Sequence, residues 1–573
     1  MTSHFGRSFL LPRALSRHTR LVQTTEEVGI STTTQWMPCY SSKREPEPSA
    51  MGSQAVNDDV FIKFDEKAPF FGRKVASKYL TEMRVCCKAA VDLTVDYLQD
   101  VEKHRPFPTV RPGFLVAQLP ADPPQEGVSM EAIFDDVDKL LLPGVTHWNH
   151  PHFHAYLAMA NSYPAVCADI VSSGIGGIGF TWASSPVSTE LEVVMTDWLV
   201  KMLGLPDFYL HNNSGGGGTF GTTCSEQTIM TMMAARDKAL EKYMSDHPGA
   251  TKYEALSKLV CYTSVLAHCS VERAGLLNLL PVRSLPVNEN FELTGETLES
   301  AIVADIAKGK VPFYCVATLG TTSCCSFDRL EEIGPVCAKH GLWLHVDAAY
   351  AASAFICPEL RHYLQGVEYT SSFSFNPHKW LLTNFDCSVV WFKDVSSVAS
   401  AFNTDAQYLK YNGMGRMPDF RNWQLSFGRK FRSLKLWFVI RKFGVSGLQS
   451  YIRQHIRMAY YLEALLRADH RFEIICTVVL GLVCFRIKND NEMTKEVHEK
   501  IEEDGRIHVV TATVTHPKMG EVFVIRVAIV HLFTDEETCD FAYHVICEIT
   551  DKVLSKHQGK LMSGQMNYAN GCT

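Results

Sequence analysis

The amino-acid sequence predicts an α/β protein in which a helical segment precedes a large parallel-sheet domain and a small α+β domain follows it. Two observations lead to this prediction. Short apolar runs alternate with helix-like segments from about residue 157 to residue 434, and helices followed by a group of strand-like runs fill the chain beyond it. Continuous apolar runs of strand length are typical of parallel strands that are covered on both faces. Strands that alternate with helices favour a parallel sheet.

The length and composition fit a large packed protein that acts on small molecules. The chain has 573 residues, of which 46% are hydrophobic and 11% aromatic, which suggests about three or four structural units. Lys plus Arg number 55 against 62 Asp plus Glu, so the net charge is −7 and no basic face for a nucleic acid is expected. No apolar run approaches the ~18 residues of a membrane span, so we expect no membrane partner.

The 18 cysteines are scattered, and no two of them form a C-x-x-C pair. This spacing argues against a zinc finger or a thioredoxin-like site. Most of the cysteines lie within apolar runs, where a free thiol behaves as a small hydrophobic side chain. No secretory signal precedes them, so the sequence predicts free thiols in a reducing, cytoplasmic compartment.

The two ends of the chain are expected to lie outside the folded body. The first two dozen residues are rich in Arg and hydroxyl residues and contain no acid before Glu26, as in a mitochondrial transit peptide. Pro12 interrupts any amphipathic helix there, so a cytoplasmic location is favoured over a mitochondrial one. A linker-like stretch rich in Pro, Glu and Ser follows. We therefore expect residues 1–77 to be a disordered extension and residues 558–573 to be a tail.

The rest of the chain divides into three segments with different patterns. Apolar residues recur at helical spacing from about residue 75 to residue 101, and residues 78–162 are predicted to form an N-terminal helical flap that serves dimerisation. Residues 163–434 are predicted to form the large α/β domain, with buried parallel strands at LVCYTSV, VPFYCVATL and GLWLHVDA. Residues 435–557 are predicted to form a small α+β domain, with helices first, then strands at FEIICTVV, LVCFRIK and VFVIRVAIV, and a last helix.

One helix of the large domain has clear end signals. The stretch FDRLEEIGPVCAKHG lies between the last two predicted strands of that domain. We expect Asp328 to cap its N-terminus and His340 with Gly341 to end it. The result is a strand, helix, strand unit of a parallel sheet.

Lys379 is the first chemical signal. It follows an aromatic strand in SFSFNPHKWLL, where it lies between His378 and Trp380 in a mainly apolar stretch. Burial disfavours an ammonium ion, and a neutral amine is what imine formation requires. A lysine that snorkels from a strand end to water is the alternative.

Asp347 is the second residue whose position indicates a chemical role. Its occurrence together with Lys379 favours a cofactor site over the ordinary structural role of either residue alone. Asp347 follows the buried strand predicted over residues 342–346, and the small residue Ala349 lies just beyond it. Strand ends are where the sites of α/β proteins collect. A carboxylate there can keep a pyridinium nitrogen protonated, so that pyridoxal phosphate works as an electron sink. A helix-capping aspartate is the alternative for this residue alone.

A glycine-rich stretch before a helix predicts a phosphate site. The sequence SGGGGTFGTTCSEQ leads into a helix whose first N–H groups and dipole would favour an anion. Hydroxyl groups of Ser225 and of Thr222 or Thr223 would add donors, and Thr321 and Thr322 offer more from a neighbouring strand end. The stretch also matches G-x-G-x-x-G, as does a second one, but neither has the strand, helix and acid spacing of a dinucleotide site.

Histidines supply one stacking candidate and one metal alternative. His268 follows another apolar strand, where a planar imidazole can stack on a planar cofactor, although a core histidine is the alternative. Four further histidines crowd one stretch: His147, His150, His152 and His154. Pro151 breaks the strand there and no acidic ligand is near, so we expect no metal.

Five motifs together resemble the group II pyridoxal-phosphate-dependent decarboxylases, and the aromatic-amino-acid decarboxylases of animals in particular. They are NPHKW around Lys379, HVDAAY around Asp347, PGVTHW, GFTWASSP and AHCSVERAG. The similarity runs with few gaps from about residue 83 to near residue 556. It implies a fold-type-I, aminotransferase-like architecture, the cofactor pyridoxal 5'-phosphate and a tight homodimer.

The resemblance also implies roles for single residues. Lys379 would form an imine with the cofactor, Asp347 would pair with its pyridine nitrogen, and His268 would stack over the ring and meet the substrate carboxylate. Tyr408, on a loop, would protonate the former α-carbon. Further cofactor contacts would come from Ala349, Cys224, Ser225, Thr322, Asn376 and His378.

The same resemblance implies an aromatic substrate pocket. Its residues would be Trp148, Tyr156, Leu157, Met159, Ile178, Phe180, His268 and Gly428. Gly428 stands where histidine-specific relatives and many tyrosine enzymes resemble one another in carrying serine, so it leaves room for a large ring. This favours dopa, 5-hydroxytryptophan or tryptophan over histidine, with tyrosine as an additional candidate substrate. Four departures from the usual dopa enzymes leave the substrate open, namely Leu157, Ala158, Met159 and Cys224.

The expected reaction is the decarboxylation of aromatic L-amino acids to amines and carbon dioxide, as in catecholamine and serotonin biosynthesis. Related aldehyde synthases replace the loop tyrosine or the stacking histidine, whereas this chain keeps Tyr408 and His268. Decarboxylation is therefore favoured over oxidative deamination to an aldehyde. Less favoured candidates are a histidine decarboxylase, a non-catalytic paralogue and a nicotinamide oxidoreductase.

Overall fold

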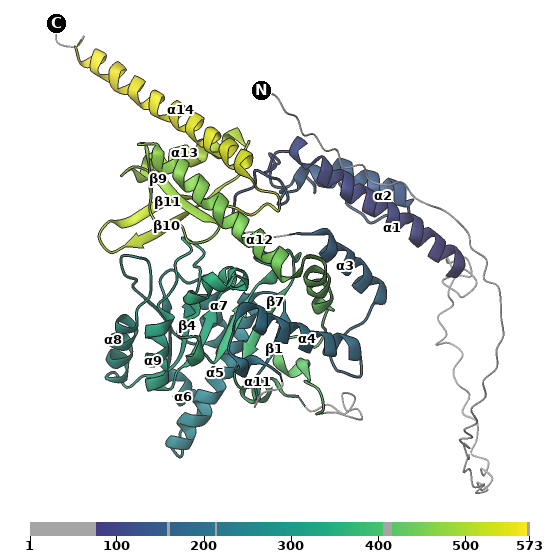
Figure 1. The fold of residues 1–573 in the computed structure, drawn as a ribbon, viewed down its shortest axis with the longest axis vertical. Coiled ribbons are helices and arrows are strands. Elements are labelled where there is room, and N and C mark those ends of the chain that lie inside the picture. The colour runs from purple at the N-terminus through teal and green to yellow at the C-terminus, as the bar shows by residue number, and fades with distance from the viewer. Residues whose placement is uncertain (1–75, 158–160, 212–214, 405–414, 570–573) are drawn as a thin grey trace, which may run out of the picture. The chain divides into compact units, whose positions relative to one another are not determined.

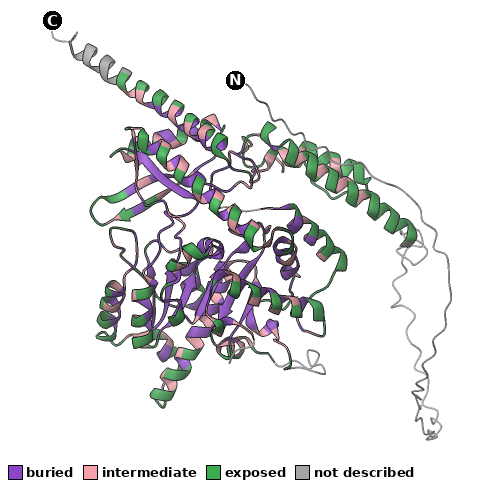
Figure 2. Cartoon of the chain, in the orientation of Figure 1, coloured by how far each residue is buried: buried purple, intermediate pink, exposed green. Residues whose placement is uncertain are grey.

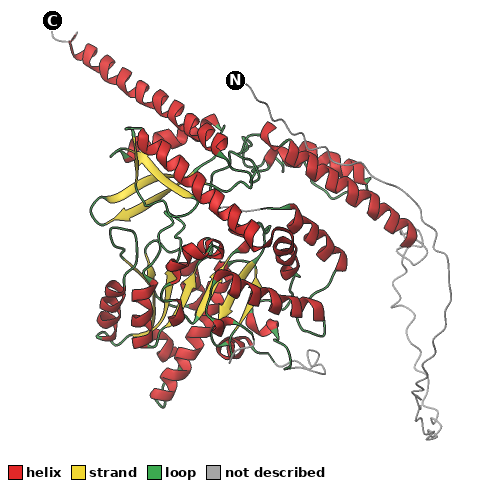
Figure 3. Ribbon diagram, in the orientation of Figure 1, coloured by secondary structure: helices red, strands yellow, loops and turns green. Residues whose placement is uncertain are grey.

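A computed structural model describes residues 76–157, 161–211, 215–404 and 415–569 of the chain (Figure 1). The strands of the described residues form two β-sheets, which Figure 3 shows in yellow among the red helices. Nearly all of the predicted extension over residues 1–77 lies outside the described residues. The helical pattern that begins there is confirmed by α1 (Ala76–Gln99).

A seven-stranded sheet with the order β1-β7-β6-β5-β4-β2-β3 forms the centre of the larger α/β part. Its strands are β1 (Gly217–Gly221), β2 (Leu259–Ser264), β3 (Val282–Leu285), β4 (Val311–Thr318), β5 (Trp343–Asp347), β6 (Ser372–Phe375) and β7 (Ser388–Phe392). Strands β3, β2, β4, β5 and β6 are parallel neighbours, and β7 pairs antiparallel with β6 and β1. The predicted parallel strands β2, β4 and β5 are thus confirmed, and they are almost entirely buried (Figure 2).

The two faces of this sheet pack against different helices because successive side chains of a strand point to opposite faces. On β4, Tyr314 and Val316 share a cluster with residues of α5 (Cys224–Asp246). Cys315 and Ala317 instead share a cluster with residues of α9 (Leu330–His340). Helices therefore cover both faces and leave the strand ends to form the site.

The remaining helices differ widely in length, and some of them lie at the second sheet. They are α2 (Met130–Asp136), α3 (Tyr163–Ile175), α4 (Pro186–Leu203), α6 (Lys252–Lys258), α7 (Ser270–Asn278), α8 (Gly295–Ile306), α10 (Pro377–Trp380), α11 (Val395–Phe402), α12 (Arg432–Ala468), α13 (Asn491–Asp504) and α14 (Glu536–Ala569). Helix α12 has a non-helical residue, Gly444, with φ 66° and ψ 171°, so it consists of two helical pieces as predicted. Glycine tolerates this backbone conformation because it has no Cβ.

The residue predicted to cap the N-terminus of α9 is wrong, whereas the predicted end of the helix at Gly341 is confirmed. Arg329, not Asp328, is the residue before the helix, and Gly341 ends it with φ 70°. The Asp328 carboxylate instead accepts hydrogen bonds from the backbone N–H groups of Leu293 at 2.9 Å and Thr318 at 2.8 Å. Asp328 therefore ties a loop to the end of β4, and burial raises its pKa to about 7.

The second sheet has four antiparallel strands in the order β10-β11-β9-β8. They are β8 (Phe472–Ile474), β9 (Leu482–Ile487), β10 (Val510–His516) and β11 (Gly520–Ala528). Three of them lie in the runs that the sequence predicts as strands. The additional strand, β10, has the sequence VTATVTH and is mostly part-exposed. It lacks the continuous apolar run by which the others were predicted, and its strand signal is the alternation of apolar and polar residues.

None of the helices in the described part of the chain combines the length and the apolar composition that a membrane crossing requires. The cysteines within the described ranges are free thiols, as predicted.

Candidate active site

One cavity lies where the carboxyl ends of β4, β5 and β6 meet. The strand register pairs Thr318 with Asp347 and Asp347 with Ser374, so these strands end level with one another. The cavity is lined by Thr223, Cys224, Ser225, His268, Ser270, Thr318, Gly320, Thr322, Asp347, Ala349, Asn376, His378 and Lys379. The structure thus brings together the nine residues that the family resemblance assigns to the cofactor, whereas Thr321, which the sequence also offered as a phosphate donor, does not line the cavity.

Lys379 lies in the short helix α10, and its neighbour fixes how that helix sits. Trp380 is fully buried and donates from Nε1 to His455 Nδ1 at 3.0 Å. Its ring also stacks on Tyr350, with centroids 4.7 Å apart. Because the tryptophan is held on the core side, the lysine before it lines the cavity.

Asp347 is the last residue of β5 and is only 4% exposed. One of its carboxylate oxygens accepts a hydrogen bond from the Ala349 N–H at 3.0 Å. This bond orients the carboxylate at the strand end, where it lines the same cavity as Lys379. A buried carboxylate requires such partners, and a ligand that carries a proton would supply another.

His268 presents a neutral ring to the cavity. Its Nδ1 accepts a hydrogen bond from the Ser270 N–H at 3.2 Å and lies 2.9 Å from the Ser270 hydroxyl. A ring nitrogen that accepts from a backbone N–H carries no proton, so the proton of this imidazole is on Nε2. Burial lowers the pKa of His268, although the charge of Asp347 opposes this change. The ring can therefore stack on a planar ligand or donate from Nε2.

His378 is held in the same tautomer by a different element. Its Nδ1 accepts a hydrogen bond from the Cys387 N–H at 3.0 Å, just before β7. Burial lowers the pKa of His378 to about 4, so the ring is neutral. Its neighbour Asn376 accepts a hydrogen bond from the Cys224 N–H at 3.1 Å and thereby joins the start of α5 to the start of α10.

The prediction that the glycine-rich stretch forms the phosphate turn is wrong in part. Most of its described glycines lie within β1, which pairs with β7, and α5 begins only at Cys224 after the cap residue Thr223. A Cβ on Gly216 would overlap the carbonyl of Phe208, and one on Gly218 would overlap the Trp391 ring. These glycines therefore allow close packing of a strand.

The donors for an anion come from the residues that follow the strand. Thr223, Ser225 and Thr322, which carry hydroxyl groups, line the cavity beside the N-terminus of α5. The dipole of a 23-residue helix favours negative charge at this end. Cys224 is buried there, and burial raises its pKa to about 12, so the thiol stays neutral.

Among the described residues, the predicted substrate residues other than His268 do not line this cavity. Trp148 stacks on Tyr156 with centroids 5.0 Å apart, and Leu157 is buried in the core. None of these three side chains is among the residues that line the cavity around Lys379.

The remaining predicted substrate residues lie nearer the surface or outside the described residues. Ile178 is 57% exposed, Phe180 is half-buried, and the space around a Cβ on Gly428 is open to 4 Å. Met159 and Tyr408, together with the departure Ala158, lie outside the described residues, as does most of the loop around Tyr408.

The cavity also contains residues that the sequence did not single out. Ser270, Thr318 and Gly320 line it, and Ser270 sets the tautomer of His268. The serine lies two residues after the histidine in the same motif, which is a signal that the sequence does contain. Thr318 could be found only once β4 was known to end beside Asp347.

The histidine-rich stretch does not form a metal site in the part of the chain that the structure describes. His147 Nδ1 is 2.8 Å from the Tyr97 hydroxyl, and His154 Nδ1 is 3.2 Å from the Ala528 carbonyl. These rings link the N-terminal segment to its neighbours.

The lining residues fit pyridoxal 5'-phosphate. Lys379 offers the amine that binds its aldehyde, Asp347 offers the carboxylate for its ring nitrogen, and the start of α5 offers donors for its phosphate. The hydroxyl of Thr318 is buried without a hydrogen-bond partner among the described residues, so a polar ligand group would satisfy it. Lys379 is the only lysine or arginine among the described residues that line the cavity.

Comparison with known proteins identifies relatives of the chain. Residues 112–488, more than half of the chain, match the pyridoxal-dependent decarboxylase conserved domain. The chain is 47% identical over 468 residues to an aromatic-L-amino-acid decarboxylase of Manduca sexta. The matched region covers 82% of this chain and 91% of that protein.

Two solved plant structures share the fold. The crystal structure of Oryza sativa TDC with PLP and tryptamine has a TM-score of 0.79 and 35% identity, covering 82% of this chain and 98% of that one. The crystal structure of Rhodiola rosea 4-hydroxyphenylacetaldehyde synthase has a TM-score of 0.76 and 37% identity, with the same coverage. The predicted architecture is confirmed by these similarities.

Proposed function

The chain belongs to the pyridoxal-dependent decarboxylase family, and from this premise we propose that it converts aromatic L-amino acids to the corresponding amines and carbon dioxide. The observation that supports this most is the meeting of Lys379 and Asp347 in one cavity beside the start of α5. Pyridoxal 5'-phosphate, when bound, supplies the electron sink that accepts the bonding pair left by the departing carboxylate.

The residues of the chain hold and orient the reacting groups in this proposal. Lys379 would bind the cofactor through its amine, and Asp347 would hold the proton on the ring nitrogen. Ser225, Thr322 and the N-terminus of α5 hold the phosphate with hydrogen bonds. His268 stacks on the cofactor ring and directs its Nε2–H toward the substrate carboxylate, because Ser270 occupies its other nitrogen.

Tyr408 delivers the proton to the former α-carbon in this proposal. An aldehyde synthase, such as the Rhodiola rosea enzyme to which the chain is similar, is the second candidate. The histidine that the decarboxylases keep is present here as His268 and lines the cavity. This supports protonation of the former α-carbon, as in a decarboxylase, over its reaction with oxygen, as in an aldehyde synthase.

The proposed substrates are dopa, 5-hydroxytryptophan, tryptophan or tyrosine. Apart from its chain neighbours, no described atom lies within 4 Å of the position of a Cβ on Gly428, which supports room for a large ring at this residue. The names of the relatives support the same class, since they are aromatic-L-amino-acid decarboxylases. Histidine is the disfavoured alternative.

We also propose that the protein works as a homodimer in the cytoplasm. Helix α1 exposes a row of apolar side chains that a second copy would cover, namely Tyr79, Leu80, Met83, Val91, Val95 and Leu98. Exposed apolar surface of this extent marks an interaction site. The free thiols of the described residues support a reducing compartment.

The test is to incubate the purified enzyme with each candidate amino acid and with histidine, both in air and without oxygen. We expect amine and carbon dioxide in equal amounts, without peroxide, under both conditions. Aldehyde, ammonia and peroxide that appear only in air would instead show an aldehyde synthase.

A further inference from the structure

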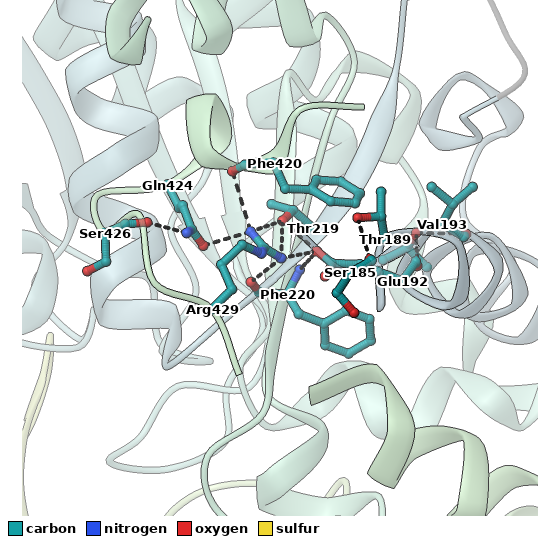
Figure 4. A network of polar contacts seen from close by, with 12 residues as sticks. Ser185, Thr189, Glu192, Val193, Thr219, Phe220, Phe420, Gln424, Ser426 and Arg429 are labelled. Atoms are coloured by element: carbon teal, nitrogen blue, oxygen red, sulfur yellow. Dashed lines mark hydrogen bonds and ion pairs between the residues drawn. The ribbon is translucent and has the colours of Figure 1, made fainter. Parts of the chain in front are cut away.

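A buried ion pair joins the segment that carries Gly428 to the strand that leads into the cavity. Arg429 and Glu192 are 5% and 4% exposed, and Arg429 Nη2 donates to Glu192 Oε1 (Figure 4). Glu192 lies on α4, whereas Arg429 follows Gly428 directly. The pair thus connects two parts of the chain that are far apart in sequence.

The carboxylate of Glu192 fixes the end of β1. The same oxygen that meets Arg429 accepts hydrogen bonds from Thr219 Oγ1 at 2.8 Å and from the Phe220 N–H at 2.9 Å. Strand β1 ends at Gly221, and Thr223 then lines the cavity. The carboxylate thus anchors the last residues of β1, whereas the start of α5 is held beside the cavity by the hydrogen bond from the Cys224 N–H to Asn376.

The guanidinium of Arg429 holds the segment in front of it. It donates to Gln424 Oε1 at 2.7 Å and to the Phe420 carbonyl at 3.4 Å, and it lies 4.9 Å from the centroid of the Phe420 ring. Figure 4 shows these residues around the arginine, with Thr219 and Phe220 on its other side. Residues 420–429 are thus fastened to β1 through one side chain.

The backbone of Arg429 reaches a third segment. Its carbonyl accepts a hydrogen bond from the Gly179 N–H at 3.3 Å. Gly179 lies between Ile178 and Phe180, both of which the family resemblance assigns to the aromatic substrate pocket. One residue therefore holds both the Gly428 segment and the turn over residues 178–180.

Stability alone does not account for such a pair. Removing two charges from water is costly, and apolar replacements of a buried ion pair are often as stable or more stable. The contacts of this pair are instead distributed over three segments that border the site. A fixed geometry of those segments is what the pair provides.

We propose that the Arg429–Glu192 pair positions the substrate-ring segments relative to the cofactor cavity. Neither side chain lines the cavity, so both act through the residues they hold. This inference rests on the proposed function, because it takes Gly428, Ile178 and Phe180 as ring contacts. Loss of the pair should loosen ring binding and leave the reacting atoms in place.

The test compares the single variant R429M with the double variant E192L/R429M. In both we expect the KM for the best aromatic substrate to rise about tenfold or more, with kcat within about threefold of wild type, because ring binding is lost uniformly. The double variant leaves no unpaired buried charge, so it should be more stable than R429M, and it should stay below wild type because Thr219 Oγ1 and the Phe220 N–H lose their acceptor. Backbone amides of residues 178–180 and 420–428 should exchange with deuterium about tenfold faster in both variants.

The matched control is R486M, which breaks a buried ion pair in the other sheet. Arg486 Nε donates to Glu473 Oε1 at 2.6 Å between β9 and β8, and its side chain is 8% exposed. This variant should lose stability and keep the wild-type KM.

A double variant that recovers both stability and the wild-type KM, with wild-type exchange at residues 420–428, would overturn the inference. If wild type itself converts no aromatic amino acid, the proposed function fails. The exchange measurement then still decides whether the pair holds these segments.

Discussion

Lys379 and Asp347 reach one cavity from two neighbouring strand ends, and each alone would have a more ordinary explanation. A chemical role for each of them could be predicted from the sequence because each follows an apolar strand. Their meeting depends on the register that sets Asp347 opposite Ser374. The Ser270 contact with His268 could not be predicted in this way, since it arises from the turn geometry before α7.

The variant D347N tests the role of the buried carboxylate. Replacing a charged group by a neutral one of the same shape should lower kcat by about 100-fold or more, since a preorganised charge at the reacting group is lost. The measurement is the rate of amine release with saturating cofactor. The control D490N exchanges one helix cap for another at the start of α13, so its rate should equal that of wild type. A D347N rate within a few-fold of wild type would contradict the assignment.

The glycines of β1 show why a local pattern can be assigned to the wrong role. Their sequence is that of a phosphate-binding turn. Yet a Cβ on Gly216 would overlap the carbonyl of Phe208, and one on Gly218 would overlap the ring of Trp391, and both of these residues belong to other elements. A sequence pattern contains no information about such contacts. The strands with continuous apolar runs, in contrast, were predictable because burial on both faces leaves a local trace.

The variant G216A should therefore destabilise the protein by about 1–3 kcal/mol or more, because its Cβ overlaps a backbone carbonyl that cannot move freely. Chemical denaturation of the holoenzyme measures this change. The control is G447A in α12, where the new Cβ would lie 3.5 Å from Phe443 Cβ in ordinary contact. Alanine there should be neutral or stabilise by about 0.5–1 kcal/mol. Equal stability of G216A and wild type would show that β1 tolerates a side chain.

Six histidines with wholly or largely buried rings make the stability of the whole molecule depend on pH. Burial lowers the pKa of each from the usual 6.5, to about 3 for His154 and to about 4 for His150, His345, His378, His455 and His531. They are neutral in the fold, whereas the unfolded chain binds protons at these residues below pH 6.5. The unfolded state is therefore favoured as the pH falls from 6.5 toward 4. Asp328 has the opposite effect, since its pKa is raised to about 7.

The thermal midpoint of unfolding should accordingly fall steadily between pH 6.5 and pH 4, because six groups outweigh one. Calorimetry at constant ionic strength measures it. A midpoint that stays constant or rises over this interval would contradict the protonation states assigned here.

The central claim is that the cavity around Lys379 and Asp347 binds pyridoxal 5'-phosphate through the lysine. The most direct measurement is to reduce the holoenzyme with borohydride, digest it and locate the pyridoxyl group by mass spectrometry. We predict one labelled peptide, with the group on Lys379, and no label after prior removal of the cofactor. A label on another lysine, or none on the yellow holoenzyme, would contradict the assignment of this cavity.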